Sequence, residues 1–334
     1  MQPANSLPRV RLLATGGTIA GTQLLGGKRG YVAAALSADA LLTAVPQVAQ
    51  LARLEAEQVA AIGSQDMDET VWLKLAARAQ AALDEPDVAG VVITHGTDTM
   101  EETAFFLNLV LRTEKPVVLV GAMRPATAIS ADGPMNLFNA VAVAVHPEMR
   151  GRGVLVVAND EIHFAREIAK TNTTQVGTFR ATYRGLAGLV HSGRIHLYAA
   201  PVRRHTAASD FSLRELTQLP RVEIVYAYAG MRPDLIHAAV RTGAAGLVLA
   251  GVGDGNVNAA CRAAAAEAAK AGVIVVRSSR TGGGVVERNI EIDDDALGFV
   301  AAEELNPAKA RVLLQLALTR TRDPRAIQEM FHVY

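Results

Sequence analysis

The sequence has little cysteine and no excess of charge of either sign. Its single cysteine, Cys261, excludes an intrachain disulfide, and this leaves the redox compartment open. The 33 basic residues balance the 33 acidic ones, so a strongly basic stripe is absent and nucleic acid is not an expected partner. Half of the 334 residues are hydrophobic, which predicts a soluble globular chain with room for two domains and a sizeable core.

Long apolar runs are also missing. No stretch reaches the ~18 residues of a membrane-spanning helix, so no membrane association is expected. The stretch MQPANSLPRV, at the start of the chain, has neither an apolar core nor a cleavage signature, so no signal peptide is predicted. A mature protein trimmed of its signal would look the same. The expectation is therefore a cytoplasmic location, with a periplasmic one left open.

What is present is an alternation of short apolar runs and amphipathic stretches of helical length. Runs rich in Val, Ile and Leu, with little polar alternation, are typical of strands buried on both faces. They predict strands over Val10–Ala14, Val59–Ile62, Gly90–Thr94, Val117–Val120 and Val154–Ala158. Helices are predicted between them over Asp68–Leu83, Glu101–Arg112 and Met135–Val145. This order indicates an α/β fold with a Rossmann-like, mostly parallel sheet and helices on both faces.

The alternation breaks over residues 199–220, which contain two prolines and several turn-forming residues and are predicted to be a linker. It then restarts. Strands are predicted over Val222–Ala227, Leu247–Gly251 and Val273–Arg277, and helices over Asp234–Arg241, Asn258–Ala271 and Pro307–Thr319. We therefore predict an N-terminal α/β catalytic domain over residues 1–198 and a smaller C-terminal α/β domain over residues 221–334.

Polar residues gather directly after the predicted strands, where ligands bind in open α/β sheets. The first three strands run into TGGT (15–18), GSQD (63–66) and HGTDT (95–99). Many of these residues are explained as caps of the helices that follow. Capping explains less well the two Gly-Thr pairs, Gly17-Thr18 and Gly96-Thr97, which follow different strands.

The glycine-rich stretch 16–30 resembles a phosphate-binding loop only in part. One glycine too many precedes Lys28, and Arg29 stands where a P-loop has the Ser or Thr that holds magnesium. The stretch GVGDGN ends in Asn256, where a dinucleotide fingerprint has its third glycine. The eight histidines are scattered without the spacing of metal ligands. No metal site is therefore predicted.

Threonine remains as the candidate nucleophile. A threonine hydroxyl attacks only when a base or an electropositive neighbour activates it. Thr18 follows two glycines, so backbone can approach a substrate closely there, and Thr97 precedes Asp98, an acceptor for a substrate ammonium group. Lys170, in AKTNTT, is the candidate base, because a desolvated lysine can lose its proton near neutral pH. The competing interpretation of Lys170 is a solvated surface lysine.

Two long motifs and several shorter ones carry a resemblance to a known family. ATGGTIAG (14–21) and THGTDTMEET (94–103) are similar to the two signatures of the bacterial L-asparaginases. The shorter matches extend this over nearly the whole chain: GSQDM, VGAMRP, KTNTT, GVGDGN and LNPAKARVLLQLALT. The chain most resembles the type II, homotetrameric class, which includes glutaminase-asparaginases. That resemblance implies hydrolysis of L-asparagine to L-aspartate and ammonia, with side activity on L-glutamine and no cofactor.

The resemblance also implies catalytic roles at matching positions. Thr18 would attack the side-chain amide carbon and form an acyl-enzyme. Tyr31 would assist proton movement from a mobile loop. Thr97, Asp98 and Lys170 would form a second cluster that activates water or stabilises the oxyanion, with backbone N–H groups completing the oxyanion site.

Substrate-binding roles are implied in both domains, at Gly17, Ser64, Gln65, Asp98, Asn256 and Glu291. Asp98 would hold the α-ammonium group, and Ser64 with Gln65 would hold the α-carboxylate and α-amine region. Asn256 and Glu291 would reach in from a neighbouring subunit of the tetramer.

Some positions depart from the family pattern or leave alternatives open. Gln65, where glutaminase-leaning relatives often carry Glu, favours asparagine, whereas GGVVERNIE around Glu291 resembles the glutaminase-asparaginases. Comparable activity on glutamine therefore stays open. Asp254 stands where many relatives have Asn, and this substitution alters the local charge. The segment from Gly21 to Gly30 is expected to be a hinge-rich lid.

Two functions from other classes stay open as alternatives. A non-catalytic amino-acid-binding protein is one, because two α/β lobes also suit a receptor. The other is a nucleotide-dependent enzyme that uses the glycine-rich loop.

Overall fold

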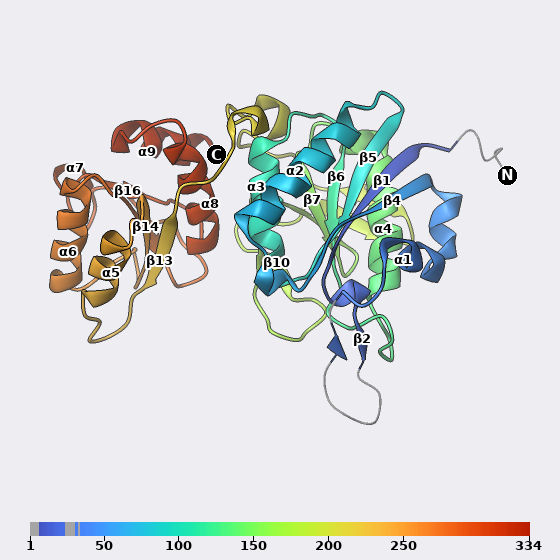
Figure 1. Cartoon of the computed structure of the whole chain (residues 1–334), viewed down its shortest axis with the longest axis horizontal. Helices are drawn as coiled ribbons and strands as arrows, with labels where there is room; N and C mark the ends of the chain where they lie inside the picture. The colour runs from blue at the N-terminus through green and yellow to red at the C-terminus, as the bar shows by residue number, and fades with distance from the viewer. Residues whose placement is uncertain (1–6, 24–30, 33) are drawn as a thin grey trace. The chain divides into compact units, whose positions relative to one another are not determined.

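The computed structural model describes residues 7–23, 31–32 and 34–334. The chain divides into two compact units, residues 1–215 and 216–334 (Figure 1). Among the helices of the described residues, none combines the length and the apolar composition needed to cross a membrane.

The N-terminal unit is built on an eight-stranded sheet in the order β12-β11-β8-β7-β6-β5-β1-β4. Five strands form its parallel part: β1 (Arg9–Gly16), β4 (Arg53–Ile62), β5 (Val88–Thr94), β6 (Val117–Val120) and β7 (Val154–Ala158). Three more continue it in antiparallel pairing: β8 (Glu161–Phe164), β11 (Gly188–His191) and β12 (Arg194–Leu197). All five predicted strands are confirmed, and the antiparallel extension was not predicted.

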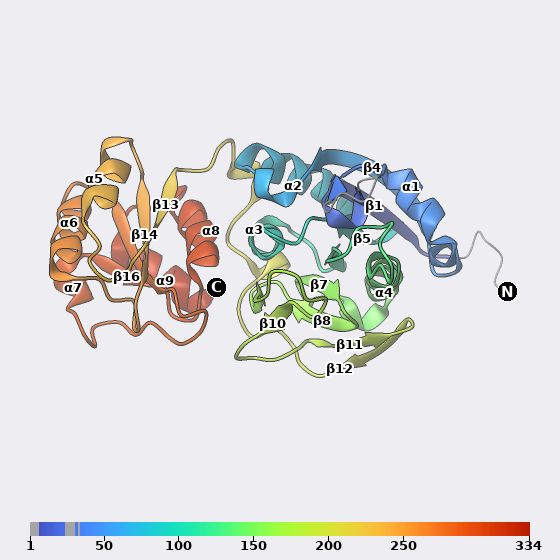
Figure 2. The same ribbon diagram turned by 90° about the horizontal axis from the view of Figure 1, so that it is seen from below.

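Helices cover both faces of this sheet, as the alternation predicted. Helices α2 (Glu69–Asp84) and α3 (Met100–Val110) lie on one face, and α1 (Ala38–Ala44) and α4 (Gly133–Val145) lie on the other (Figure 2). The core between the sheet and α4 is formed by apolar side chains. Strands such as β6 and β7 are buried along their whole length. Burying apolar surface on both faces of central strands is what a parallel sheet requires.

The strand order fixes where a ligand would bind. Among the parallel strands, β1 lies between β4 and β5, so the chain leaves β1 on one side and later crosses to the other. This is the doubly wound order 2-1-3-4-5, in which ligands bind beyond the carboxyl ends of the strands at the switch point. Here the switch point lies between β1 and β5, whose following turns contain Thr18 and Thr97.

Short elements complete the N-terminal unit. The hairpin of β9 (Ile168–Lys170) and β10 (Phe179–Ala181) contains Lys170, and β2 (Thr22–Gln23) pairs with β3 (Tyr31–Val32). Residues 199–220, predicted as a linker, contain two short 3-10 helices, η6 (Thr206–Ala208) and η7 (Leu213–Glu215).

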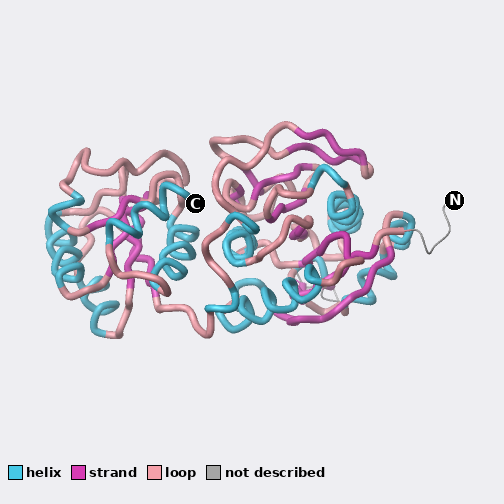
Figure 3. The backbone as a smooth tube through the Cα atoms, turned by 90° about the horizontal axis from the view of Figure 1, so that it is seen from above, coloured by secondary structure: helices cyan, strands magenta, loops and turns pink. Residues whose placement is uncertain are grey.

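The C-terminal unit is a four-stranded parallel sheet between two layers of helices (Figure 3). Its strands are β13 (Val222–Tyr226), β14 (Gly246–Gly251), β15 (Ile274–Ser279) and β16 (Phe299–Ala301). One layer contains α5 (Asp234–Arg241) and α6 (Ala259–Lys270), and the other contains α8 (Pro307–Leu318) and α9 (Pro324–Val333). A single-turn helix, α7 (Asp294–Leu297), precedes β16. The predicted mostly parallel α/β architecture is confirmed in both units.

Candidate active site

The turns that contain Thr18, Ser64 and Thr97 pack against one another through glycine backbone. Gly17 has φ 80°, and a Cβ atom there would lie 2.3 Å from the Cα of Gly96. A Cβ atom on Gly96 would lie 2.6 Å from the Oγ of Ser64. These approaches are too close for any side chain. The glycines therefore serve close contact between the ends of β1, β4 and β5.

Thr18 is held in a short, defined turn. It opens the 3-10 helix η2 (Thr18–Ala20), and its carbonyl accepts a hydrogen bond of 2.8 Å from the N–H of Gly21. The preceding N–H, of Gly17, donates to the carbonyl of Ile62 over 2.9 Å, which ties the turn to the end of β4. Thr18 is only 7% exposed. Its hydroxyl is thus placed by backbone bonds at the switch point.

Lys170 links the hydroxyl of Thr97 to the carboxylate of Asp98. Its Nζ donates to Thr97 Oγ1 over 2.9 Å and to Asp98 Oδ1 over 2.6 Å. The backbone N–H of Lys170 donates to Oε2 of Glu101 over 2.7 Å, which anchors β9 to the start of α3. The Lys170 side chain is 16% exposed, so it is not the solvated surface lysine of the competing interpretation. An ammonium group bonded to a hydroxyl oxygen stabilises the ionised form of that hydroxyl.

Ser64 and Gln65 differ in what they contact. The Ser64 Oγ accepts a hydrogen bond of 3.0 Å from the N–H of Asp98, and the Thr99 hydroxyl donates to the Ser64 carbonyl over 2.7 Å. Ser64 therefore joins the turn after β4 to the Thr97–Lys170–Asp98 cluster. The exposed Gln65 side chain donates to Oδ2 of its neighbour Asp66 over 3.3 Å.

A polar cavity of about 440 Å³ adjoins this cluster. Its lining includes three charged side chains, those of Asp98, Glu101 and Lys170, together with residues 171–173. Such a cavity is large enough for a free amino acid, and it offers partners for both an ammonium and a carboxylate group.

His95, the last residue before Gly96, was not predicted as part of the site. Its ring is fully buried, and desolvation lowers its pKa to about 4, so the imidazole is neutral at neutral pH. The Nδ1 atom lies 2.6 Å from the Gly96 carbonyl, which can only accept, so Nδ1 carries the proton. The sequence signal for this role is the position of His95 directly before Gly96 in the motif THGTDTMEET. His95 thus fixes the peptide that precedes Thr97.

The buried, neutral state of His95 predicts a pH dependence of stability. Unfolded histidine binds a proton below pH ~6.5, whereas folded His95 does so only near its pKa of about 4. The free energy of unfolding should therefore fall as pH drops from 6.5 to 4, by up to roughly 3 kcal/mol from this residue. Urea unfolding of His95→Gln should show a shallower dependence in this range. The exposed His191→Gln is the control, and equal slopes for wild type and His95→Gln would contradict the assignment.

Loops beyond β6 support the same edge of the sheet. The Asp132 carboxylate accepts from the N–H groups of Met123 and Arg124, each over 2.9 Å. The Asn136 Nδ2 donates to the carbonyl of Gly121 over 3.0 Å, and a Cβ on Gly121 would lie 3.1 Å from the Thr97 Cγ2. These contacts hold the backbone of Gly121, in the motif VGAMRP, against the side chain of Thr97.

Part of the predicted site lies outside the described residues. The backbone of Tyr31 belongs to β3 and pairs with Gln23. Its side chain, and residues 24–30 of the predicted lid, lie outside the part of the chain that the structure describes.

In the C-terminal unit, Asn256 and Glu291 are brought together. The Asn256 Nδ2 donates to Oε2 of Glu291. Asn256 also exchanges two backbone hydrogen bonds with Val252, of 2.9 and 2.8 Å, which close the turn. Asp254, between them, accepts at Oδ1 from the N–H of Glu287 over 3.0 Å. The Asp254 side chain thus links the turn after β14 to the loop after β15.

A buried ion pair holds the turn after β14 in place. Arg277 and Asp294 are joined over 2.7 Å, and the Arg277 Nη1 donates to the Asp254 carbonyl over 2.8 Å.

In the described parts of both units, no group of His, Cys, Asp and Glu side chains could hold a metal ion.

Comparison with known proteins gives matches along nearly the whole chain. The family model "Asparaginase, N-terminal" matches residues 9–203, and "Glutaminase/Asparaginase C-terminal domain" matches residues 221–331. The probable periplasmic L-asparaginase of Haemophilus influenzae is 51% identical over 98% of this chain and 93% of its own. L-asparaginase 2 of Escherichia coli is 49% identical over 99% and 94%, respectively. The glutaminase-asparaginase of Pseudomonas fluorescens biotype A is 42% identical over 100% and 92%.

Proposed function

The chain belongs to the asparaginase family, and on that basis we propose that it hydrolyses L-asparagine to L-aspartate and ammonia through an acyl-enzyme on Thr18. L-Glutamine is a side substrate, in keeping with the glutaminase-asparaginase among its relatives. The observation that carries the proposal is the hydrogen-bonded cluster of Thr97, Lys170 and Asp98 beside the Thr18 turn.

In the first step the Thr18 oxygen attacks the carbon of the side-chain amide. The carbonyl oxygen becomes negatively charged, and backbone N–H groups, including that of Thr97, stabilise it. Tyr31 assists the transfer of the hydroxyl proton towards the leaving nitrogen. Collapse of the tetrahedral intermediate breaks the carbon–nitrogen bond and releases ammonia. An ester between the substrate and Thr18 remains.

In the second step water hydrolyses this ester. Lys170, bonded to the Thr97 oxygen, lowers the free energy of ionising that hydroxyl, and the Thr97 cluster can then take a proton from water. The hydroxide adds to the ester carbon. As the bond from this carbon to the Thr18 oxygen breaks, the proton taken from water passes from the Thr97 cluster to the Thr18 oxygen, and L-aspartate is released. The Asp98 carboxylate keeps Lys170 oriented towards Thr97.

Recognition of a free amino acid needs partners for an ammonium and a carboxylate. Asp98 offers its second oxygen to the ammonium, because a carboxylate accepts at both oxygens and only Oδ1 is needed by Lys170. The Ser64 hydroxyl accepts from the Asp98 N–H and still has its own proton to donate to the α-carboxylate. Gly17 and Gln65 complete the site. A simple amide has neither an ammonium nor a carboxylate group, so it would leave the Asp98 carboxylate and the Ser64 hydroxyl without their partners. The site should therefore strongly disfavour simple amides.

We further propose a homotetramer in which active sites are shared. The paired Asn256 and Glu291 would then contribute from a neighbouring subunit, with Glu291 directed to the substrate ammonium. Their mutual hydrogen bond presents both side chains as one unit.

Initial rates of ammonia release from both amides test this function. One methylene distinguishes the substrates, so kcat/KM for asparagine should exceed that for glutamine by about 10- to 200-fold. Equal or higher values on glutamine would favour the glutaminase-asparaginase alternative. Tight binding of aspartate without any turnover would instead favour an amino-acid-binding protein, and the enzymatic proposal would be wrong.

A further inference from the structure

The first turn of α3 is bonded to two separate segments of the candidate site. Thr99, the N-cap residue of α3, contacts the turn after β4, and Glu101 contacts the end of β9. Asp98, the residue before Thr99, is paired with Lys170. One turn of helix therefore joins parts of the site that lie far apart in the sequence.

Thr99 does not use its side chain as an N-cap residue commonly does. A threonine at this position usually accepts a hydrogen bond from an N–H group of the first helical turn. Within the described chain Thr99 makes no such side-chain cap, and its hydroxyl instead donates to the Ser64 carbonyl over 2.7 Å. The N–H of Asp98 donates to Oγ of the same serine over 3.0 Å. Two consecutive residues thus hold both the backbone and the side chain of Ser64.

The bond from Thr99 is what ties the Ser64 peptide to another strand end. Ser64 opens the short 3-10 helix η4 (Ser64–Asp66), and within this turn its carbonyl also accepts from the N–H of Met67 over 3.2 Å. The bond from Thr99 is shorter, and it comes from the turn after β5. It therefore fixes the orientation of Ser64 relative to the Thr97–Lys170–Asp98 cluster.

Glu101 holds Lys170 by its backbone. Its Oε2 accepts from the Lys170 N–H over 2.7 Å, and a hydrogen bond to a carboxylate is stronger than one to a neutral acceptor. The next N–H along the chain, of Thr171, donates to the Thr178 carbonyl over 2.9 Å, on the side of β10. Successive N–H groups of a strand point to opposite sides, so that of Lys170 points to α3. Glu101 thus takes the place of a neighbouring strand at this edge of β9.

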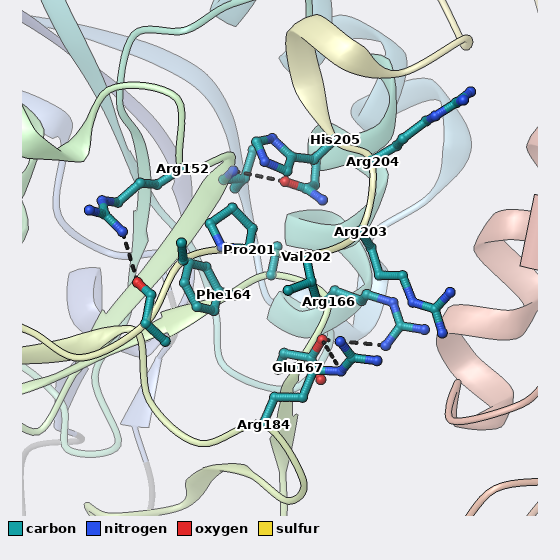
Figure 4. Close-up of a pocket in the computed structure, with 15 residues that line it drawn as sticks. Arg152, Phe164, Arg166, Glu167, Arg184, Pro201, Val202, Arg203, Arg204 and His205 are labelled. Carbon is teal, nitrogen blue, oxygen red and sulfur yellow. Dashed lines mark hydrogen bonds and ion pairs between the residues drawn. The ribbon is translucent and has the colours of Figure 1, made fainter. Parts of the chain in front are cut away.

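The other end of α3 is bonded to a different part of the sheet. The Asn108 Oδ1 accepts from the N–H of Val154, the first residue of β7, over 2.9 Å. Both residues line a separate cavity of about 350 Å³ (Figure 4). Thr18 and Thr97 follow the carboxyl ends of parallel strands, so this cavity lies at the opposite edge of the sheet. Asn108 therefore offers a comparison in which α3 loses a bond away from the site.

We propose that Thr99 and Glu101 are positioning residues for amide hydrolysis, each for a different step; this rests on the proposed function. Thr99 orients Ser64 for the substrate α-carboxylate, so it acts on binding. Glu101 places Lys170, which favours ionisation of Thr97 in the hydrolysis of the ester, so it acts on the second step. Each acts through the residue that it holds.

Steady-state kinetics of ammonia release from asparagine tests the role of Thr99. Thr99→Val should raise KM by about 5- to 10-fold, the size of one hydrogen bond, and change kcat by less than about 2-fold. Valine keeps the shape of threonine, and it costs α3 no side-chain cap in the described chain. Isothermal titration with L-aspartate should show affinity reduced by the same factor. Thr99→Ser, which keeps the hydroxyl, should restore both values.

Glu101→Ala should show the opposite kinetic pattern. Its kcat should fall by about 10- to 100-fold, because a misplaced catalytic group loses up to ~100-fold in rate. Slow hydrolysis of the ester lets acyl-enzyme accumulate and lowers KM together with kcat, so kcat/KM should stay near the wild-type value. Intact-mass spectrometry of quenched enzyme should show the added aspartyl group. Glu101→Gln, whose amide oxygen can still accept from the Lys170 N–H, should recover most of kcat.

Two controls separate positioning from general weakening of the fold. Asn108→Ala leaves the buried N–H of Val154 without its acceptor, so it should lower the melting temperature while kcat and KM stay at wild-type values. Asp39→Ala removes an exposed acid from the first turn of α1 and should also leave both constants unchanged. This second control shows whether loss of negative charge at a helix start is enough to change the kinetics.

Three results would overturn the positioning roles. The first is wild-type kinetics in both Thr99→Val and Glu101→Ala. The second is the same rise of KM in Asn108→Ala as in Thr99→Val, and the third is a rise of KM in Glu101→Ala. Wild-type protein that binds aspartate without releasing ammonia would instead refute the proposed function. Aspartate affinity would still decide the role of Thr99, because equal affinities of wild type and Thr99→Val would overturn it.

Discussion

Replacing Thr18 with valine is expected to lower kcat for asparagine by about 10⁴-fold or more, because removal of the nucleophile of a covalent mechanism has effects of this size. Valine keeps the shape of threonine and lacks only the hydroxyl. The turn around residue 18 is held by backbone hydrogen bonds, so the melting temperature should change little. Ammonia release and thermal unfolding, measured on the same preparation, check both expectations.

Two further variants sharpen this test. Thr18→Ser keeps a hydroxyl and should retain measurable turnover, whereas Thr18→Val should not. Thr43→Val makes the same change on α1, where the hydroxyl donates to the carbonyl of Asp39, and should leave kcat unchanged. Wild-type activity in Thr18→Val would show that another group forms the bond to the substrate.

Lys170→Met is expected to lower kcat by about 10³-fold, within the range that removal of a positioned acid–base group produces. Methionine has similar length but cannot donate to Thr97 or neutralise Asp98, so the hydroxyl loses the neighbour that favours its ionised form. If the cluster acts on the second step, acyl-enzyme should accumulate. Intact-mass spectrometry of rapidly quenched enzyme should then show one added aspartyl group in Lys170→Met.

Charge alone should not restore this function. Lys170→Arg keeps a positive charge, but a planar guanidinium cannot reproduce the two bonds from one Nζ to Thr97 and Asp98. We expect Lys170→Arg to remain at least ~10-fold below wild type. The exposed Lys270→Met is the matched control in the other unit. Full activity in Lys170→Met would remove Lys170 from the mechanism.

The buried parallel strands were predictable because continuous apolar runs mark them. β6 and β7 match their predicted ranges, since every residue in them is buried. β4 begins at Arg53 rather than at the predicted Val59. The prediction missed its first half because charged and apolar residues alternate there, without a continuous apolar run. The antiparallel β11 and β12 are short and half-exposed, so they lack a continuous apolar signal.

The sequence predicts members of the candidate site, but it does not predict their geometry. Motifs marked Thr18, Thr97 and Lys170, yet their approach depends on strand order and on the contact between Gly17 and Gly96. Neither the strand order nor this glycine contact can be predicted from a local sequence pattern. The role of His95 depends on complete burial, which is a property of the folded chain.

The central claim is that Thr18 carries the acyl group, and peptide mapping of the trapped intermediate tests it most directly. Lys170→Met enzyme would be mixed with asparagine, quenched in acid within milliseconds to seconds, digested and sequenced by mass spectrometry. The account predicts an aspartyl ester on Thr18, in the peptide that contains ATGGTIAG, and none in Thr18→Val. An aspartyl group on Thr97 instead, or turnover by Thr18→Val at the wild-type rate, would contradict it.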